Sequence, residues 1–504
     1  MYPIIFLSLG VYCLTTFVTQ VSEEIGANIH TGKYGWRTFA VIGATILLPP
    51  GSLPGQERTY VILLGAIICW KYFTTDFDLG VHKREVLYRI LLLITFILSC
   101  FDFAFVLLFI FIAIQWLNAW EHHAMLILRT LKINYSLFVV LSIWSFLGIA
   151  PNDMIITGSF LFLNSLVIAC HYFRPGIDKI VLGKSLTAWV MKNDTHHLIM
   201  SAYNWGWARF IPERHVIAFT RFIASFVPVL NFFVLAFELS PVFMLALQGY
   251  FVIVLIGLAA IQLIIFLLTG INFWENVVSL LIAAWIFAWL YRQDMIAWSG
   301  MDALIYAALL VITIYLIKVW APWQLAWWDT PFAGRVNWYL IGCSGRRYRL
   351  SNRFMCPHER LYGHLHGYFL VKHGILHGHP PGAVYNFHLK NLVLATGGRL
   401  DELRALQATR GKKRYSPELS SRHLAYLTTF FSNYNRGKRK NILPLFLRWL
   451  KAPGGQFFYW GDCPEFRSQE KVRCIEIYYE EFFFTGTENV RLTVEKLAVI
   501  GDLG

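Results

Sequence analysis

The stretch Ala169-Cys170-His171-Tyr172-Phe173-Arg174-Pro175-Gly176-Ile177-Asp178-Lys179-Ile180 decides the fold. It closes a long apolar run with ionisable side chains, and its Pro-Gly pair predicts a break in the helix. Ionisable groups are costly inside a membrane, so they are usually paired, line a wet cavity or take part in function. Lys179 is therefore the first candidate for a functional side chain.

The composition is that of an integral membrane protein. Hydrophobic residues make up 57% of the 504 residues and charged residues only 15%. A bilayer core is roughly 30 Å thick, so a spanning helix needs about 20 mostly apolar residues. The apolar runs lack the alternation of barrel strands, which leaves helices as the spanning elements. We expect an all-α multi-pass transmembrane domain of eight to ten spans, followed by a smaller α+β soluble domain.

The chain is predicted to divide into three parts. Residues 1–84 hold N-terminal transmembrane helices, 85–320 form the main transmembrane domain, and 321–504 form a basic, water-exposed domain. Spans are expected at Tyr2–Thr19, the two halves of Tyr88–Trp120 joined by a turn at Cys100-Phe101-Asp102, Leu131–Ile149, Met154–Cys170, Val216–Phe237, Val242–Leu268, Val277–Leu290 and Leu304–Val319. Thr38–Leu48 and Tyr60–Tyr72 are short enough to be tilted, re-entrant or partly buried spans. Trp189, Trp205 and Trp207 in the polar stretch His171–Arg214 indicate an interfacial belt.

Short-range patterns indicate strands and helices in the C-terminal part. Alternation and aromatic or β-branched content predict strands at Phe457-Phe458-Tyr459-Trp460, Lys471–Phe484 and Asn489–Ala498. Glu402–Ala408 and Ser420–Ser432 are predicted to be helices. Val336–Cys343 lacks clean alternation, so no strand is predicted there.

The formal charge of +14 is concentrated in the last third of the chain. Beside a membrane, such charge favours anionic headgroups and a cytoplasmic face over nucleic acid. The lipid bilayer is therefore the expected partner. We expect the Lys83-Arg84 loop and the domain from Trp328 onward to face the cytoplasm. Labelling of Cys463 or Cys474 in intact cells by an impermeant thiol reagent would contradict this.

Cysteine and histidine spacing does not firmly imply a metal site. The eight cysteines contain no CxxC pair. Pairing of Cys343 with Cys356, or of Cys463 with Cys474, depends on the compartment. The soluble domain carries a histidine-rich stretch whose spacing matches no specific zinc pattern. Its members are His358, His364, His366, His373, His377 and His379.

Two interpretations of Lys179 remain open. It could extend its ammonium to the headgroups from a helix end. Alternatively, an apolar pocket would lower its pKa, and the neutral amine could act as a base near neutral pH. Asp178 would oppose that shift if its carboxylate faced the ammonium.

Glu121-His122-His123 forms a second polar group at the end of a span. It could bind a metal, act as an acid–base pair, or cap a helix in the interface. Asn118 and His122 are four residues apart and share a helix face, whereas His123 points about 100° away from His122.

These motifs resemble those of a known family. Tyr172-Phe173-Arg174-Pro175-Gly176-Ile177-Asp178-Lys179-Ile180, followed by Trp189, is similar to the tyrosine…Gly-x-x-Lys-Leu…Trp signature of the HTTM (horizontally transferred transmembrane) superfamily, which includes vitamin-K-dependent γ-glutamyl carboxylases. Glu121-His122-His123 resembles the family's Asn-Asn-His. Leu268-Thr269-Gly270-Ile271-Asn272-Phe273-Trp274 resembles its Gly-x-Phe-x-Tyr/Trp segment. The resemblance covers residues 85–320.

The resemblance implies a site and a chemistry. Lys179 would be the base that starts oxygenation of a quinol, reduced vitamin K or menaquinol, and His123 would be a nearby catalytic group. Further pocket candidates are Asn118, His122, Tyr172, Arg174 and Trp189.

The leading hypothesis is a quinol-dependent carboxylase, a lyase, or another enzyme that modifies or matures a peptide or protein, in the cell (inner) membrane. The alternative is a non-enzymatic membrane scaffold or maturation chaperone that binds a client protein or anionic lipid.

Overall fold

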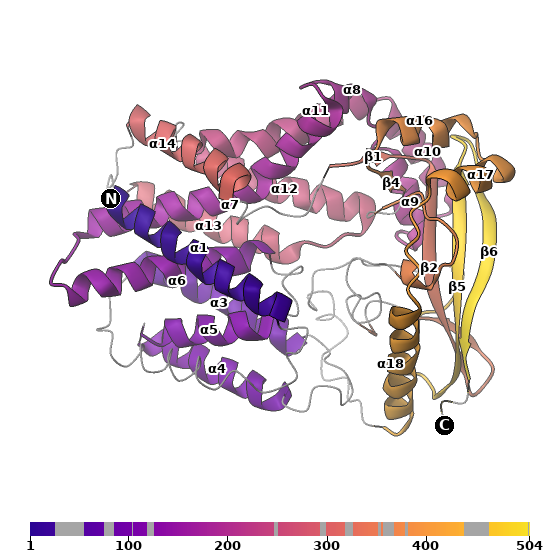
Figure 1. The fold of residues 1–504 in the computed structure, drawn as a ribbon, viewed down its shortest axis with the longest axis horizontal. Coiled ribbons are helices and arrows are strands. Elements are labelled where there is room, and N and C mark those ends of the chain that lie inside the picture. Colours follow the sequence, from indigo (N-terminus) through magenta and orange to yellow (C-terminus); the bar gives the residue numbers. More distant parts are fainter. Residues whose placement is uncertain are drawn as a thin grey trace.

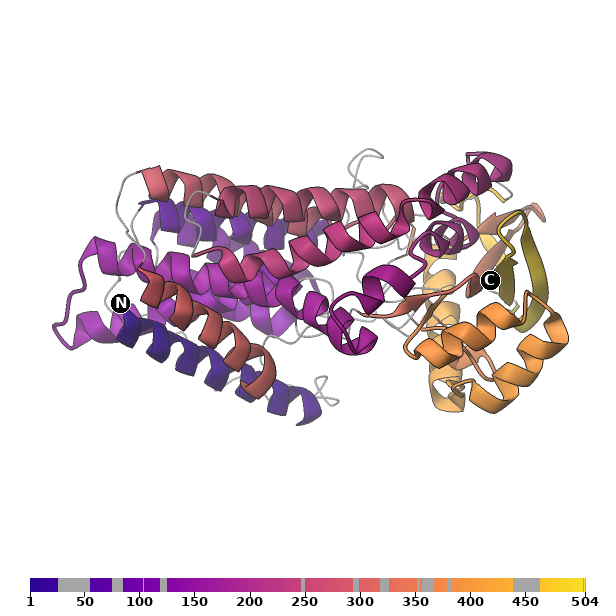
Figure 2. The ribbon, with the colours of Figure 1, turned by 90° about the horizontal axis from the view of Figure 1, so that it is seen from above.

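The computed structural model describes residues 1–25, 55–74, 85–102, 104–117, 125–245, 250–292, 299–317, 326–350, 354–355, 367–378, 382–437, 463–501 and 503. A bundle of long helices occupies one end of the molecule, and a β-sheet with its own helices occupies the other (Figure 1). Seen from above, the long helices run along the longest axis toward the sheet region (Figure 2).

The first half of the bundle follows the apolar runs of the sequence. Its helices are α1 (Tyr2–Ile25), α3 (Gly55–Thr74), α4 (Glu85–Phe101), α5 (Phe105–Leu117) and α6 (Met125–Phe146). The turn predicted at Cys100-Phe101-Asp102 is confirmed, because α4 ends at Phe101 and the Asp102 carboxylate accepts a hydrogen bond from the Ala104 amide at 2.9 Å.

Helix α7 (Asp153–Gly183) is the longest element, with 31 residues and a length of about 46 Å. It begins where the Asn152 side chain accepts the Ile155 amide hydrogen at 2.9 Å, and it ends at Lys184 in the left-handed conformation. The break predicted at Pro175-Gly176 is wrong, because the helix runs through both residues. A proline removes one backbone donor from a helix, and packing on both sides holds this helix together.

The second half of the bundle contains shorter helices around α7. They are α8 (Ala188–Lys192), α9 (His197–Trp205), α10 (Glu213–Ala224), α11 (Val227–Leu239), α12 (Phe251–Thr269), α13 (Trp274–Arg292) and α14 (Gly300–Val311), which leads into a π-helical turn, η4 (Ile312–Ile317).

The predicted single span Val216–Phe237 is not one straight helix. α10 and α11 meet at an angle of 71°. Pro228 lies in the first turn of α11, where its missing backbone donor cannot bond to the preceding turn and α10 cannot continue.

Four of the described helices are long and apolar enough to cross a membrane, or five if the bent pair forms one span. The four are Leu126–Phe146, Asp153–Gly183, Phe251–Thr269 and Trp274–Arg292. The expected total of eight to ten spans stays a prediction, because Thr38–Leu48 lies outside the described residues and the apolar helices Tyr2–Leu14, Arg89–Phe101 and Gly300–Tyr315 are shorter.

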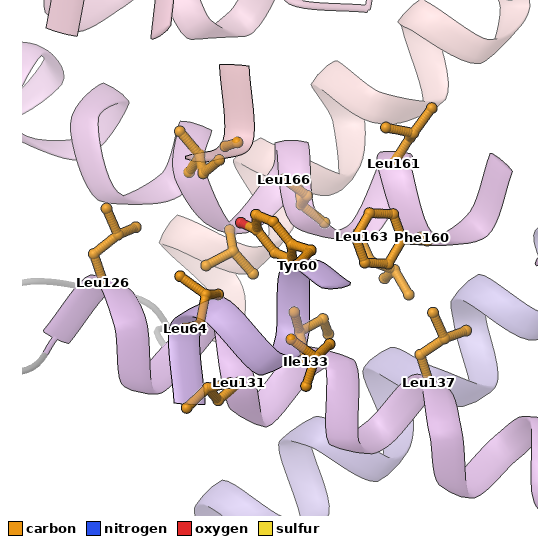
Figure 3. Close-up of a cluster of buried hydrophobic side chains, with 14 of the residues drawn as sticks. Tyr60, Leu64, Leu126, Leu131, Ile133, Leu137, Phe160, Leu161, Leu163 and Leu166 are labelled. Carbon is orange, nitrogen blue, oxygen red and sulfur yellow. The ribbon is translucent and has the colours of Figure 1, made fainter. Parts of the chain in front are cut away.

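Aliphatic and aromatic side chains from α3, α6 and α7 interdigitate in the centre of the bundle (Figure 3). Several polar side chains in this core are paired across helices. Asn134 on α6 and Asn164 on α7 exchange two amide hydrogen bonds, at 2.8 and 3.2 Å. The Thr157 hydroxyl donates to the Glu57 carboxylate at 2.5 Å. These bonds fix the register of α7 against its neighbours, since a buried unpaired polar group would be costly.

The C-terminal region is built on an antiparallel sheet in the order β3-β2-β5-β6. Its strands are β2 (Phe332–Gly342), β3 (Arg347–Arg349), β5 (Val472–Phe484) and β6 (Asn489–Ile500), with a separate pair β1 (Trp328–Asp329) and β4 (Ala383–Val384). The same region contains three helices, α16 (Phe387–Ala395), α17 (Leu400–Arg410) and α18 (Pro417–Asn435).

The strand predictions Lys471–Phe484 and Asn489–Ala498 and both helix predictions are confirmed. Phe457–Trp460 lies outside the described residues. Strand β2 was not predicted, because nearly every residue along it is buried and the sequence therefore does not alternate.

Candidate functional site

Lys179 lies near the end of α7 and is only 6% exposed. Its ammonium Nζ is 2.5 Å from each carboxylate oxygen of Glu238 on α11. The same nitrogen lies 5.0 Å from the ring centroid of Trp189 on α8. The ammonium thus meets a carboxylate and an aromatic face, and the interpretation in which it reaches out to the headgroups is wrong.

Close packing of α7 against α11 brings these groups together. A Cβ atom added at Gly176 would lie 2.9 Å from Leu239 Cδ2 and 3.2 Å from Glu238 Cβ. Gly176 therefore provides the close approach of α11 at the turn that precedes Lys179. Gly257 of α12 allows similarly close packing against Phe237 of α11, since a Cβ at Gly257 would lie 2.3 Å from the Phe237 ring.

Asp178 does not pair with Lys179. Its Oδ1 accepts a hydrogen bond from Arg174 Nε at 2.7 Å, one turn earlier on α7. The Arg174 guanidinium lies 5.6 Å from the ring centroid of Tyr315. Arg174 and Asp178 thus form a second ion pair beside the Lys179–Glu238 pair, and each lysine or arginine has its own carboxylate.

Tyr172 lies on the Lys179 face of α7, because seven residues make two helical turns, about 10.5 Å along the axis. It is 5% exposed, and its ring meets the His171 imidazole edge to face at 5.0 Å between centroids. Of the pocket candidates, Trp189 contacts the Lys179 ammonium, whereas Arg174 and Tyr172 lie about 7.5 and 10.5 Å away along the axis of α7.

Trp189 also joins the bundle to the sheet region. Its indole Nε1 donates to the carbonyl of Trp327 at 2.9 Å. Its ring belongs to a cluster with Trp328, Val384 and Leu235. Trp205 is buried too and donates to the carbonyl of Gly334 at 3.2 Å. The interfacial belt expected from these tryptophans is wrong for this pair, because both face the sheet region.

A buried polar network continues this junction. The Asn193 amide donates to Asp329 Oδ2 at 2.8 Å, and the Asp329 backbone amide donates back to Asn193 Oδ1 at 2.8 Å. Lys390 Nζ on α16 is 2.6 Å from Asp194 Oδ2. Burial raises the pKa of Asp329 from 3.8 to about 7, against the hydrogen bonds from Asn193 and Trp327 and the nearby Lys390 charge.

The other candidate site residues are not placed by the structure. Asn118, His122 and His123 lie outside the described residues, so their position relative to Lys179 stays a prediction. Glu238 was not predicted as a site residue. The sequence does mark it, because it is the only acidic residue between positions 216 and 240, which include the expected span Val216–Phe237 and the three residues after it.

The histidine-rich stretch shows no metal-binding arrangement where it is described. His377 Nε2 lies 3.2 Å from the Tyr479 hydroxyl, and burial lowers the pKa of His377 to about 3, so the ring is neutral. His373 Nε2 lies 3.4 Å from Glu495. Within the described part of the chain, no three His, Cys, Asp or Glu side chains gather as metal ligands.

Replacing Gly176 with valine should destabilise the protein by about 1–3 kcal/mol, because the new methyl groups would force α11 away from α7. The matched control is Gly10→Val in α1, where an added Cβ meets nothing within 4 Å. Thermal unfolding of both variants in detergent checks this. Equal midpoints for the two variants would show that α7 and α11 do not depend on the glycine.

No protein-family model, curated protein or solved structure matches this chain.

Proposed function

We propose that this chain is a multi-pass membrane enzyme that uses the Lys179–Glu238 pair to transfer a proton from a quinol. The observation that carries the proposal is the burial of this ion pair beneath Trp189, at the end of an apolar helix. Buried ion pairs contribute little net stability compared with apolar residues of similar volume. In a membrane segment, an ionisable residue is by default a functional candidate.

The depth of the pair suits a substrate that arrives from the bilayer. Lys179 is 26 residues beyond Asp153, or about 39 Å along α7, which exceeds the roughly 30 Å of a hydrocarbon core. The pair would then lie at the membrane boundary, beside the sheet region. A lipid-soluble quinol could approach from one side and a peptide from the other.

The proton chemistry begins within the pair. An ammonium cannot accept a proton, so Lys179 first transfers one to Glu238, which lies within hydrogen-bond distance. The neutral amine then accepts a proton from the substrate hydroxyl. Trp189 lies over the Lys179 ammonium, and Leu239 packs against the apolar cluster that contains Trp189.

The residues around Lys179 fit a quinol. They offer a buried amine, the aromatic face of Trp189 and the apolar side chains of Ile180, Leu235 and Leu239, and apolar side chains with few polar groups are usual at cofactor sites. Reduced vitamin K or menaquinol would supply electrons for dioxygen. The motif resemblance favours modification of a peptide or protein glutamate as the coupled reaction, in the cell (inner) membrane.

The proposal is tested by the quinone content of the purified chain. Lipid extracts of the intact protein should contain menaquinone or vitamin K in amounts that scale with protein, and Lys179→Ala should not oxidise the added quinol. The Gly10→Val variant is the control for handling. A protein that neither retains nor responds to either quinol would contradict the proposed function.

The second candidate function is a non-enzymatic scaffold or maturation chaperone. The observation in its favour is that both Glu238 oxygens contact Lys179 Nζ, so the pair could serve only to hold α7 against α11. Under this function, apolar replacement of both residues would leave client binding intact. Under the enzymatic function, it would abolish turnover.

A further inference from the structure

We propose that α10 is an interfacial anchor that binds the headgroups of anionic phospholipids. The helix lies where the bundle meets the sheet region (Figure 1). Its surface is divided into three sectors of different chemistry, and each sector faces a different environment.

The first sector packs on the protein. Val216 and Thr220 are 6% and 0% exposed. Val216 belongs to a cluster with Ile199 and Tyr203 of α9 and Phe484 of β5. This contact fixes the rotation of α10 about its own axis, so the positions of the other two sectors are determined.

The other two sectors are exposed. Arg214 and Arg221 are seven residues apart and therefore lie on the same side of the helix. Phe219 and Phe222, three residues apart, are 43% and 60% exposed and lie on a neighbouring side. Adjacent residues of a helix point about 100° apart, so Arg221 and Phe222 face different directions. A helix with an apolar and a basic side is typical of one that lies in the membrane interface.

The neighbouring span fixes the depth of α10. Helix α12 has 19 residues, or about 28 Å, which matches the roughly 30 Å of the hydrocarbon core. Its outer side is apolar and exposed, as at Ile264 (52%) and Leu267 (67%). Leu268, in the last turn of α12, packs in the same cluster as Val216 of α10. α10 therefore lies at the level where this span leaves the hydrocarbon.

The orientation of α10 is also that of an interfacial helix. The 71° bend turns it away from the direction of α11, so α10 runs close to the membrane plane if α11 runs across it. The phenylalanines then enter the acyl region, and the two arginines face the phosphate layer. Neither arginine forms an ion pair within the described part of the chain, which leaves both guanidinium groups for phosphate.

Photo-crosslinking tests the apolar sector. The full chain with p-benzoylphenylalanine at position 222 is placed in nanodiscs of phosphatidylcholine and phosphatidylglycerol and irradiated. We expect a phospholipid adduct at position 222 and none above background at the control position 494, which is 51% exposed on β6. Absence of a lipid adduct at 222, or an adduct that joins two protein chains, would overturn the proposal.

A titration with phosphatidylglycerol in detergent, followed by native mass spectrometry, tests the basic sector. Each arginine near an anionic surface contributes favourable binding free energy, and loss of two arginines should weaken lipid binding about 30-fold. We therefore expect this loss in Arg214→Gln/Arg221→Gln and none in the control Arg410→Gln/Arg422→Gln, whose arginines are exposed on α17 and α18. Equal binding by both double variants would overturn the anionic-lipid assignment.

Discussion

Replacing Glu238 with alanine is expected to lower the free energy of unfolding by about 3–5 kcal/mol, because it leaves the buried Lys179 ammonium without its carboxylate. The same loss should abolish proton transfer, since Lys179 would have no group to accept its proton. Thermal unfolding in detergent measures the first effect, and quinol oxidation measures the second.

Two controls separate burial from simple loss of charge. Glu402→Ala breaks an exposed pair between Glu402 of α17 and Arg399, and we expect a much smaller loss of stability for it because water screens the pair. The double variant Lys179→Met/Glu238→Leu removes both charges together and should recover most of the stability lost by Glu238→Ala. If Glu238→Ala were no more damaging than Glu402→Ala, the ion pair would not be buried as described.

The second large effect concerns Asp329, which connects β1 to the loop after α8. Burial raises the pKa of Asp329 from 3.8 to about 7. Between pH 4 and pH 7 the folded protein therefore keeps a proton that the unfolded chain releases. Protonation of Asp329 therefore contributes about 4 kcal/mol to the free energy of unfolding. This stabilisation is fully present below pH 4 and is lost as the pH rises through 7.

The variant Asp329→Asn isolates this contribution, because asparagine does not titrate. The unfolding free energy of Asp329→Asn should increase relative to that of the unaltered protein as the pH rises from 4 to 8. Other titratable groups at the junction, Asp194, Lys390 and His196, are present in both proteins and largely cancel. A difference that stays constant over this range would show that Asp329 is ionised throughout.

The helical class of the bundle could be predicted from the sequence because apolar runs are long and their ends carry local signals. The turn at Asp102 is one such signal, confirmed by its carboxylate cap. Helix continuity was harder to predict. Pro175 and Gly176 indicate a break locally, yet Gly176 is what allows α11 to pack closely against α7. Pro228 had the opposite outcome, because the predicted single span Val216–Phe237 bends by 71° just before it.

The site was only half predictable, for a similar reason. Lys179 stands out because a charge in an apolar helix is costly. Its nearest carboxylate in the sequence, Asp178, points to Arg174, while the actual partner, Glu238, is 59 residues away. Local sequence cannot rank these carboxylates, since the choice depends on which helix packs against α7. The solvent-free strand β2 was missed because burial on both faces removes the alternation that identifies strands.

The central claim is that Lys179 and Glu238 carry out chemistry and do more than join two helices. The most direct test is quinol oxidation by the folded double variant Lys179→Met/Glu238→Leu, compared with the unaltered protein. Its rate should fall by at least about 100-fold, the usual contribution of a positioned base, while thermal unfolding stays close to that of the unaltered protein. A quinol oxidation rate equal to that of the unaltered protein would contradict the claim.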